Sequence, residues 1–335
     1  MKEVAVLGAG SWGTALAIHL GRLGKSVRLW GRSSSLIDRI RQERRNEVYL
    51  PGVPLPPSVV PTASLDDAVS RAECLVSAVP SQATRALLRR AKPFLEADTI
   101  IVSAAKGFEL GSLRRLSEVI TEELGETQPV AVLSGPSFAA ELARSRPTAV
   151  LVASRQLDVS SVVQHEFRAA SCLRLYASDD VVGVEVGGAM KNVIAIAAGV
   201  VEGLELGPNA MAALITRGLA EISRLAEALG GRRETMAGLS GLGDLILTCT
   251  GGLSRNWQVG VELGRGHALD QVLARMHSVA EGVKTTEAAL ELGRRYQVDL
   301  PISSQMDAVL QGRTEVKVAV ESLILRRQRA ETDES

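Results

Sequence analysis

A glycine-rich turn near the amino terminus has the spacing of a phosphate-binding loop. Gly8, Gly10 and Gly13 form a G-x-G-x-x-G pattern that follows the apolar run Val4–Leu7 and precedes the helical pattern Thr14–Leu23. In this context the first glycine permits a tight turn, the second lets the backbone approach a pyrophosphate, and the third lets the helix pack on the strand. The helix amino terminus adds unpaired N–H groups and a partial positive charge. The pattern predicts a dinucleotide site, and a glycine-rich turn without a ligand is the alternative.

The end of the second predicted strand bears on the choice of nicotinamide cofactor. An NAD-selective site usually places Asp or Glu there to hold the ribose 2′-OH. This chain has Arg32 followed by serines, and the first acid downstream is Asp38. A guanidinium suits a 2′-phosphate better than a bare ribose. NADPH is therefore favoured and NADH stays open, while residues 35–38 also fit a capping box for the next helix.

A single lysine stands in a strongly apolar stretch of the second half. In residues 186–201 only Lys191 and Asn192 are polar, so this segment is expected inside the protein. Burial lowers the pKa of a lysine and brings it toward the range where it exchanges protons at neutral pH. Lys191 is therefore the candidate acid/base, and a lysine that snorkels from a helix-packing seam is the alternative. Asp244, between a glycine turn and an apolar run, is the expected partner that holds it.

A polar triplet precedes a helix that is expected to begin near Trp257. Ser254, Arg255 and Asn256, together with the free N–H groups of a helix start, would form a good phosphate site. The alternative is that the serine and asparagine only cap the helix and that the arginine is a solvated surface residue.

Two loops of the first half carry polar groups directly after predicted strands, where ligands of open α/β sheets bind. Lys106 follows the run Ile100–Ser103, and Gly135 and Ser137 follow the run Val130–Leu133. A lysine after a strand is usually a surface residue. Because both loops leave the same edge of a parallel sheet, we expect them to converge on one crevice.

The elements that position these residues fall into two classes. Six short apolar runs read as buried strands: Val4–Leu7, Val27–Trp30, Leu75–Val79, Ile100–Ser103, Val130–Leu133 and Ala149–Val152. Cys172–Tyr176 is expected to be a last strand. Helical patterns such as Thr14–Leu23, Ala83–Lys92 and Leu113–Leu124 lie between them. This alternation predicts an α/β fold with a Rossmann-type, doubly wound, mainly parallel sheet over residues 1–180.

The second half has a different periodicity. From about residue 181 the strand signal fades, and six segments read as helices separated by glycines: Val186–Glu205, Ala210–Leu229, Trp257–Arg265, Leu269–Met276, Val283–Arg295 and Gln305–Leu310. Residues 181–328 are therefore expected to form an all-helical substrate and catalytic domain. Residues 329–335 are polar and are expected to fray.

Composition excludes several classes of function. The chain has 335 residues, with 38 Lys+Arg against 38 Asp+Glu, so it offers no basic excess for nucleic acid. Three widely spaced cysteines favour a reducing compartment, and four scattered histidines have no metal-ligand spacing. The longest apolar-plus-glycine run, Val193–Val201, is nine residues, too short for a membrane span. A soluble cytoplasmic protein without a metal is expected, and a homodimer is the prior for its assembly.

Taken together, the motifs resemble a known family. The stretches are GAGSWGTALA, YLPG, VPSQ, AAKGFE, LSGPSFA, GAMKNVIAIAAG, GLGDLILTCT, SRN and AEG, in unbroken order from residue 1 to about 325. This set is similar to bacterial NAD(P)-dependent glycerol-3-phosphate dehydrogenase. The resemblance implies interconversion of sn-glycerol 3-phosphate and dihydroxyacetone phosphate, which feeds phospholipid synthesis.

The resemblance also implies roles for individual residues. Lys191 would be the acid/base. Substrate contacts would come from Lys106, Gly135, Ser137, Lys191, Asp244, Ser254, Arg255 and Asn256. Besides the glycine turn, cofactor contacts would come from Ser11, Trp12, Arg32, Tyr49, Lys106, Ala139, Arg255, Val279 and Glu281, of which Tyr49 and Val279 rest on position within loosely patterned stretches.

Two rival hypotheses remain at this stage. A β-hydroxyacid dehydrogenase would share a Rossmann half, a helical half and a lysine, but its substrates carry a carboxylate in place of the phosphate. A catalytically silent nucleotide-sensing module would use the helical half for dimerisation and would not need Lys191, Asp244 and Arg255, which are all present.

Overall fold

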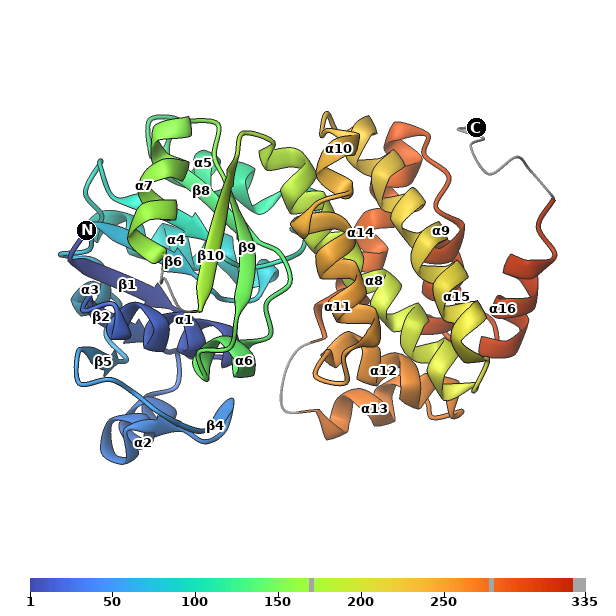
Figure 1. Ribbon diagram of the computed structural model, residues 1–335, viewed down its shortest axis with the longest axis horizontal. Coiled ribbons are helices and arrows are strands. Elements are labelled where there is room, and N and C mark those ends of the chain that lie inside the picture. The colour runs from blue at the N-terminus through green and yellow to red at the C-terminus, as the bar shows by residue number, and fades with distance from the viewer. Residues whose placement is uncertain (169–171, 277–279, 328–335) are drawn as a thin grey trace.

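The computed structural model describes residues 1–168, 172–276 and 280–327, and Figure 1 shows a sheet half joined to a helical half. An eight-stranded sheet in the order β10-β9-β8-β7-β6-β1-β2-β5 forms the centre of the first half. Its strands are β1 (Glu3–Leu7), β2 (Ser26–Trp30), β5 (Val59–Thr62), β6 (Cys74–Ser77), β7 (Ile100–Ser103), β8 (Val130–Ser134), β9 (Thr148–Ala153) and β10 (Leu173–Ser178). A separate antiparallel pair is formed by β3 (Arg45–Asn46) and β4 (Leu50–Pro54).

Helices cover both faces of the large sheet. Along β1, Val4 and Val6 join a core with α1, α2, α6 and α7, whereas Ala5 and Leu7 join a second core with α3, α4 and α5. These elements are α1 (Ser11–Arg22), α2 (Ser34–Glu43), α3 (Leu65–Val69), α4 (Thr84–Ala91), α5 (Leu116–Leu124), α6 (Ala139–Ala143) and α7 (Leu157–Phe167), with short 3₁₀ turns η1 (Ser81–Ala83) and η2 (Lys92–Phe94). The prediction of a doubly wound fold is confirmed.

The predicted strands are present, with ends shifted by at most two residues. The sheet is mainly parallel, as expected, because β8 pairs antiparallel with β9 while the other pairs are parallel. Strand β5 and the β3–β4 pair have no counterpart in the sequence analysis. Pro61 lies in β5, and Pro51 and Pro54 lie in β4, so prolines that cannot donate to a ladder weaken the strand signal of these edge segments.

Predicted helix starts in the first half differ from the observed ones by up to three residues, and the helix expected from Thr14 begins at Ser11. The helix expected from Leu113 begins at Leu116, because Leu113 has a left-handed backbone (φ 60°). The capping box expected at residues 35–38 is absent, since the Oγ of Ser33 accepts the Leu36 N–H at 3.3 Å and α2 begins at Ser34. The capping serine therefore lies two residues earlier than predicted.

The second half is all-helical over the described residues, as expected. Its elements are α8 (Val181–Gly203), α9 (Gly207–Ala228), α10 (Arg233–Met236), the π-helical turn η3 (Leu239–Gly243), α11 (Asp244–Thr250), α12 (Arg255–Gly264), α13 (Leu269–Arg275), α14 (Glu281–Tyr296), α15 (Pro301–Leu310) and α16 (Val316–Ile324). Helix α8 starts five residues before the predicted position and runs from the junction with the sheet half into the centre of the bundle (Figure 1).

Glycines bring α12 into close contact with α8. A Cβ on Gly260 would lie 1.9 Å from the Ile196 carbonyl oxygen, and a Cβ on Gly199 would lie 2.0 Å from the Trp257 carbonyl oxygen. Only glycine permits this separation of the two backbones. The crossing therefore fixes the start of α12, where the polar triplet lies, relative to Lys191 on α8.

Helix α8 is long and apolar enough to cross a membrane, which the nine-residue run in the sequence did not reveal. Its most apolar window of 18 residues is 94% buried within the protein, against α9, α11, α12 and α14. The segments 233–250 and 255–264 are long and apolar enough to cross a membrane only when they are counted together as one span with a bend. Burial on all sides identifies α8 as the core helix of the helical half.

Candidate active site

The glycine turn has the geometry that its sequence predicts. Gly8 adopts φ 121°, and a Cβ there would lie 2.6 Å from the Ala78 carbonyl oxygen. A Cβ on Gly13 would lie 1.9 Å from the Gly8 carbonyl oxygen, whereas a Cβ on Gly10 would meet open space. Among the described residues no side chain caps the amino terminus of α1. The turn thus presents helix N–H groups beside open space, which fits a pyrophosphate.

A buried asparagine supports this turn from the β3 segment. The Nδ2 of Asn46 donates to the Ala9 carbonyl oxygen at 2.9 Å and to the Thr14 Oγ1 at 2.8 Å. Its Oδ1 accepts the Tyr49 N–H at 3.3 Å, so the half-buried Tyr49 is held near the same end of the sheet. Asn46 was missed in the sequence because a lone asparagine beside arginines reads as a surface turn.

Arg32 follows β2 at the carboxyl edge of the sheet and is exposed. Within the part of the chain that the structure describes, its guanidinium makes no hydrogen bond or ion pair, so it is available to an anion. Asp38 is also exposed but pairs with Arg41 on α2 at 2.8 Å. Because Asp38 is already paired and Arg32 is not, Arg32 remains the candidate for binding the 2′-phosphate of the cofactor.

Three charged side chains meet where the two halves join. The Nζ of Lys191 on α8 and the Nζ of Lys106, on the loop after β7, both donate to the Asp244 carboxylate, one to each oxygen. Asp244 is 0% exposed and Lys191 is 8% exposed. One carboxylate faces two ammonium groups, so the cluster carries excess positive charge in a site of low dielectric.

The surroundings of Lys191 change its protonation. Desolvation lowers the pKa of Lys191 well below its usual range, the Asp244 carboxylate opposes that shift, and the Lys106 charge adds to it. The Thr248 hydroxyl accepts from the Lys191 Nζ at 2.8 Å and donates to the Asp244 carbonyl oxygen at 2.6 Å. The ammonium is therefore held by a carboxylate and a hydroxyl. Thr248, four residues after Asp244, could have been found by its helical spacing.

The loop after β8 joins the same cluster. Lys106 Nζ donates to the Gly135 carbonyl oxygen at 3.1 Å, and the Ser137 Oγ donates to that oxygen at 2.9 Å. Gly135 has φ 127°. Ala139 begins α6 and packs against the core of the sheet half. The expected convergence of the two loops is present in the structure.

The start of α12 combines two structural contacts with an exposed cation. Ser254 is the N-cap, and its Oγ accepts the Trp257 N–H at 3.3 Å, which is the structural role left open in the sequence. The helix begins at Arg255, two residues earlier than predicted, and Arg255 is exposed. Asn256 is buried, and its Oδ1 accepts the Gly282 N–H at 2.9 Å.

Glu281 is the first residue of α14 and connects the helical half with the sheet half. Its carboxylate accepts the Ser81 N–H at 3.0 Å from the turn after β6. Desolvation raises the pKa of Glu281, and the Ser81 N–H and the charges of Arg255, Lys106 and Lys191 oppose that rise. The charges of all three cations therefore act on the Glu281 carboxylate.

The structure therefore gathers most of the predicted residues. Lys106, Gly135, Ser137, Lys191 and Asp244 form one hydrogen-bonded group, while Ser254, Arg255, Asn256 and Glu281 lie around the start of α12 and α14. Ser11 and Trp12 lie at the start of α1, Arg32 follows β2, and Tyr49 lies between β3 and β4. In the described part of the chain none of these four side chains hydrogen-bonds to that group. Val279 lies outside the described residues.

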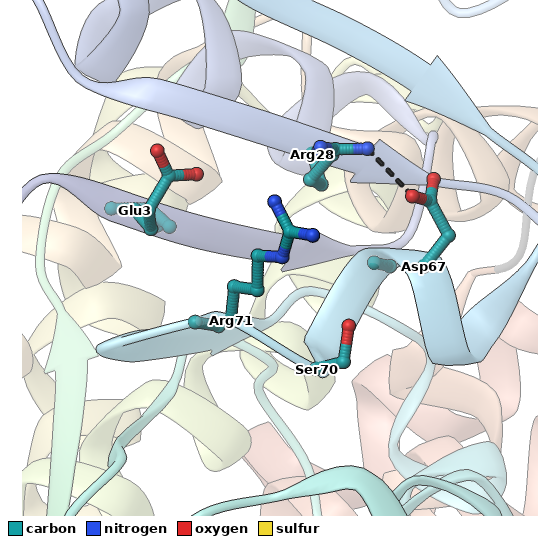
Figure 2. A pocket seen from close by; sticks show the side chains of 8 residues that line it. Glu3, Arg28, Asp67, Ser70 and Arg71 are labelled. Atoms are coloured by element: carbon teal, nitrogen blue, oxygen red, sulfur yellow. Dashed lines mark hydrogen bonds and ion pairs between the residues drawn. The ribbon is translucent and has the colours of Figure 1, made fainter.

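A separate pocket opens at the opposite edge of the sheet (Figure 2). It has room of about 130 Å³ and is lined by Glu3, Arg28, Asp67, Ser70 and Arg71, among others. Arg28 and Asp67 pair at 2.7 Å. The pocket lies between the amino end of β1, the middle of β2 and the segment from α3 to β6, and it shares no residue with the predicted site.

Two family models cover nearly the whole chain. The model described as NAD-dependent glycerol-3-phosphate dehydrogenase N-terminus matches residues 3–160, and the corresponding C-terminus model matches residues 180–321. The C-terminus model begins at residue 180, next to the start of α8, and the N-terminus model ends within α7.

Individual relatives agree with this match. Glycerol-3-phosphate dehydrogenase [NAD(P)+] of Koribacter versatilis is 51% identical over 314 residues, covering 92% of this chain and 93% of the relative. The protein of the same name from Bacillus velezensis is 47% identical over 328 residues, covering 97% and 95%. The crystal structure of glycerol-3-phosphate dehydrogenase from Coxiella burnetii superposes with a TM-score of 0.94 at 40% identity, covering 97% of this chain and 99% of that one. Sequence, fold and relatives agree that this chain belongs to the NAD-dependent glycerol-3-phosphate dehydrogenase family.

Proposed function

We propose that the residues gathered between the two halves carry out the reaction of this family as follows. The chain is an oxidoreductase that interconverts sn-glycerol 3-phosphate and dihydroxyacetone phosphate with NADPH or NADH, and it supplies glycerol 3-phosphate for phospholipid synthesis. The observation that carries the assignment of roles is the buried Lys191 ammonium against Asp244, with a second ammonium from Lys106 beside it.

Lys191 is the acid/base in this proposal. In ketone reduction its Nζ donates a proton to the oxygen on C2 as that oxygen becomes an alkoxide, and in alcohol oxidation it takes the proton back. A lowered pKa supports this role, because a group that titrates nearer neutrality gives and accepts a proton with smaller free-energy cost. Asp244 and Thr248 hold the Nζ in place and thereby fix the direction of transfer.

The excess positive charge serves the substrate phosphate and the developing alkoxide. Arg255, exposed at the start of α12, binds the phosphate together with the N–H groups of that helix start. Ser254 and Asn256 shape the helix start through the contacts described above, and Lys106, Gly135 and Ser137 line the substrate from the sheet side. Holding a phosphorylated substrate at its remote end orients the carbonyl for reaction.

The sheet half would hold the cofactor, and the Gly8–Gly13 turn would bind its pyrophosphate. Arg32 binds a 2′-phosphate, which favours NADPH over NADH, and further contacts come from Ser11, Trp12, Tyr49, Ala139 and Glu281. When bound, the nicotinamide supplies or accepts the hydride at C2 of the substrate. The open space beside Gly10 and the uncapped start of α1 support this placement.

Oxidation of NADPH followed by absorbance, with dihydroxyacetone phosphate as the second substrate, tests the proposal. We expect turnover that saturates in both substrates and competitive inhibition by inorganic phosphate against dihydroxyacetone phosphate. If the protein instead turns over a β-hydroxyacid and inorganic phosphate does not inhibit it, the β-hydroxyacid dehydrogenase reaction is the correct assignment.

The proposal extends to the organisation of the protein. Residues 1–180 act as the dinucleotide-binding unit and residues 181–328 as the substrate unit, and two copies form a homodimer in the cytoplasm. The division of the family models supports the first statement. Sedimentation equilibrium tests the dimer, and a monomer at micromolar concentration contradicts it.

A further inference from the structure

The V-P-S-Q stretch at residues 79–82 ends in Gln82, to which the reaction described above assigns no role. It forms the turn after β6 and the start of η1. Gln82 is half-buried, and its side chain points at the backbone of another loop. Its Nε2 donates to the Phe108 carbonyl oxygen at 2.7 Å, and its Oε1 accepts the Leu110 N–H at 2.9 Å. One amide therefore clamps two backbone groups of the loop that follows β7.

This clamped loop is the one that carries Lys106. Gly107, directly after the lysine, has φ 149°, and a Cβ there would lie 2.9 Å from the Ser81 Oγ. Phe108 is 1% exposed and belongs to the core of the helical half. The loop thus leaves the sheet, rests on the Ser81–Gln82 turn, and inserts one aromatic ring into the other half of the molecule.

We propose that Gln82 is a positioning residue for Lys106, which rests on the proposed function. By fixing the backbone at Phe108 and Leu110, its amide holds the Lys106 ammonium on the Asp244 carboxylate and the Gly135 carbonyl oxygen. A displacement of about 1 Å in such a group can lower turnover by about a hundredfold. The glutamine itself touches neither Lys106 Nζ nor Lys191 Nζ, so its effect passes through the loop.

The position of Lys106 also controls the protonation of Lys191. The groups that face Lys191 are Asp244 and Cys249 from α11, Lys106 from the loop after β7, and Glu281 from α14. Of these, Lys106 is the like charge that lowers the pKa of Lys191. If the loop relaxes and Lys106 retreats, the pKa of Lys191 rises, and the pH above which ketone reduction slows moves in the alkaline direction.

The decisive experiment compares Gln82→Met with a matched control. Gln82→Met keeps the length of the side chain and removes both of these hydrogen bonds, together with the contact from Nε2 to the Ser81 Oγ at 3.3 Å. Gln128→Met removes the amide contact of another half-buried glutamine, which donates to the Thr99 carbonyl oxygen at the opposite edge of the sheet. We expect kcat for dihydroxyacetone phosphate to fall by about tenfold or more only in the Gln82 variant. In this variant the pH above which ketone reduction slows should rise by about 0.5 pH unit or more.

A fall in kcat within threefold of wild type, a fall equal to that of the Gln128 variant, or an unmoved alkaline limb would overturn the positioning role. Absence of turnover in the wild-type protein would instead refute the proposed function, so the two failures are distinguishable. If Gln82→Met does not fold, Gln82→Glu decides the question. A protonated carboxyl donates to Phe108 O and accepts from Leu110 N, whereas a carboxylate cannot donate. Gln82→Glu should therefore lose kcat with rising pH in a range where wild type does not, and a profile parallel to wild type contradicts the proposal.

Discussion

Helix α8 carries two buried charged clusters to the sheet half, and they differ in how their charges are balanced. Near its start, the Glu185 carboxylate accepts the Ser117 N–H at 2.8 Å, the Ser117 hydroxyl at 2.5 Å and Arg115 Nη1 at 2.9 Å. Arg115 also pairs with Glu118 at 2.7 Å. Every strong acceptor in this first cluster has a donor within the protein.

The second cluster, six residues further along α8, has two ammonium groups on one carboxylate. Lys191 and Lys106 together exceed the charge of Asp244, and Arg255 and Glu281 add a further pair at longer range. A buried cluster with excess charge costs free energy that a purely structural contact would avoid. In the first cluster the buried charges form one neutral pair, Arg115 with Glu185, and the second carboxylate, Glu118, is partly exposed. The difference teaches that a buried pair of opposite charges holds the halves together, whereas two ammonium groups on one buried carboxylate mark the place for an anionic ligand.

Lys191→Met should give the largest effect. Removing the proton donor is expected to lower turnover by about a hundredfold or more, because general acid catalysis contributes about that much. NADPH binding should stay within about threefold of wild type, since the glycine turn is untouched. Single-turnover absorbance and fluorescence titration with NADPH measure the two quantities, and turnover within tenfold of wild type means that Lys191 is not the acid/base.

The same variant should leave stability nearly unchanged or higher. Asp244 keeps Lys106 as a partner after the substitution, and the buried ammonium with its desolvation cost is gone. A clear loss of Tm would contradict the idea that Lys191 serves chemistry at the expense of stability.

Glu185→Ala is the opposite case and should act on stability first. It removes the acceptor of the Ser117 N–H and leaves the buried Arg115 with Glu118 as its remaining carboxylate. We expect a loss of about 3 kcal/mol in the free energy of unfolding, because the buried Ser117 N–H and hydroxyl and one nitrogen of the buried Arg115 lose their acceptor. Urea denaturation measures it. A loss below about 1 kcal/mol would remove the contrast between the two clusters.

Arg255→Ala tests the exposed cation at the rim of the unbalanced cluster. The variant should raise KM for dihydroxyacetone phosphate by about tenfold or more, because a charge-assisted contact to phosphate contributes about 1.5–3 kcal/mol. Stability should change by less than about 0.5 kcal/mol, as for other exposed side chains. Steady-state kinetics provide the readout, and an unchanged KM places the phosphate elsewhere.

A change of pH is the smallest perturbation of the cluster around Lys191, and it tests the protonation of that cluster. In the proposed mechanism ketone reduction needs the Lys191 ammonium, and the pKa of Lys191 lies well below its usual range because of burial and the Lys106 charge. The kcat for reduction should therefore fall as pH rises through that lowered pKa, while glycerol 3-phosphate oxidation should rise across the same interval. Stopped-flow rates in both directions check the sign. A reduction rate that stays level up to the ordinary lysine range would show that the ammonium is not desolvated in the working enzyme.

The fold could be predicted to a large extent because its signals are local. Continuous apolar runs gave the strands near their observed ends, and the change of periodicity near residue 181 coincides with the start of α8. Errors concentrate where a local signal is weak or misleading. The prolines of β4 and β5 hid edge strands, and Leu113 has helical propensity but adopts a left-handed backbone.

The candidate site could be predicted only as a set of residue types. A lone lysine in an apolar helix and an acid after a glycine turn are visible in the sequence, and the structure places Lys191 and Asp244 in contact. Gln82 and Asn46 were not found, since each acts on backbone groups far along the chain, and nothing in the local pattern announces such a partner.

By itself, the sequence determined which residues are apolar, which turns need glycine, and how few polar groups enter the core of α8, because these depend on local sterics and on transfer from water. The tertiary structure decided which charge meets which. A hydrogen bond between residues 53 or 138 positions apart, as for Lys191 and Lys106 on Asp244, depends on how helices cross. The close approach of glycines 199 and 260 sets such a crossing, and a pKa follows from the resulting distances and burial.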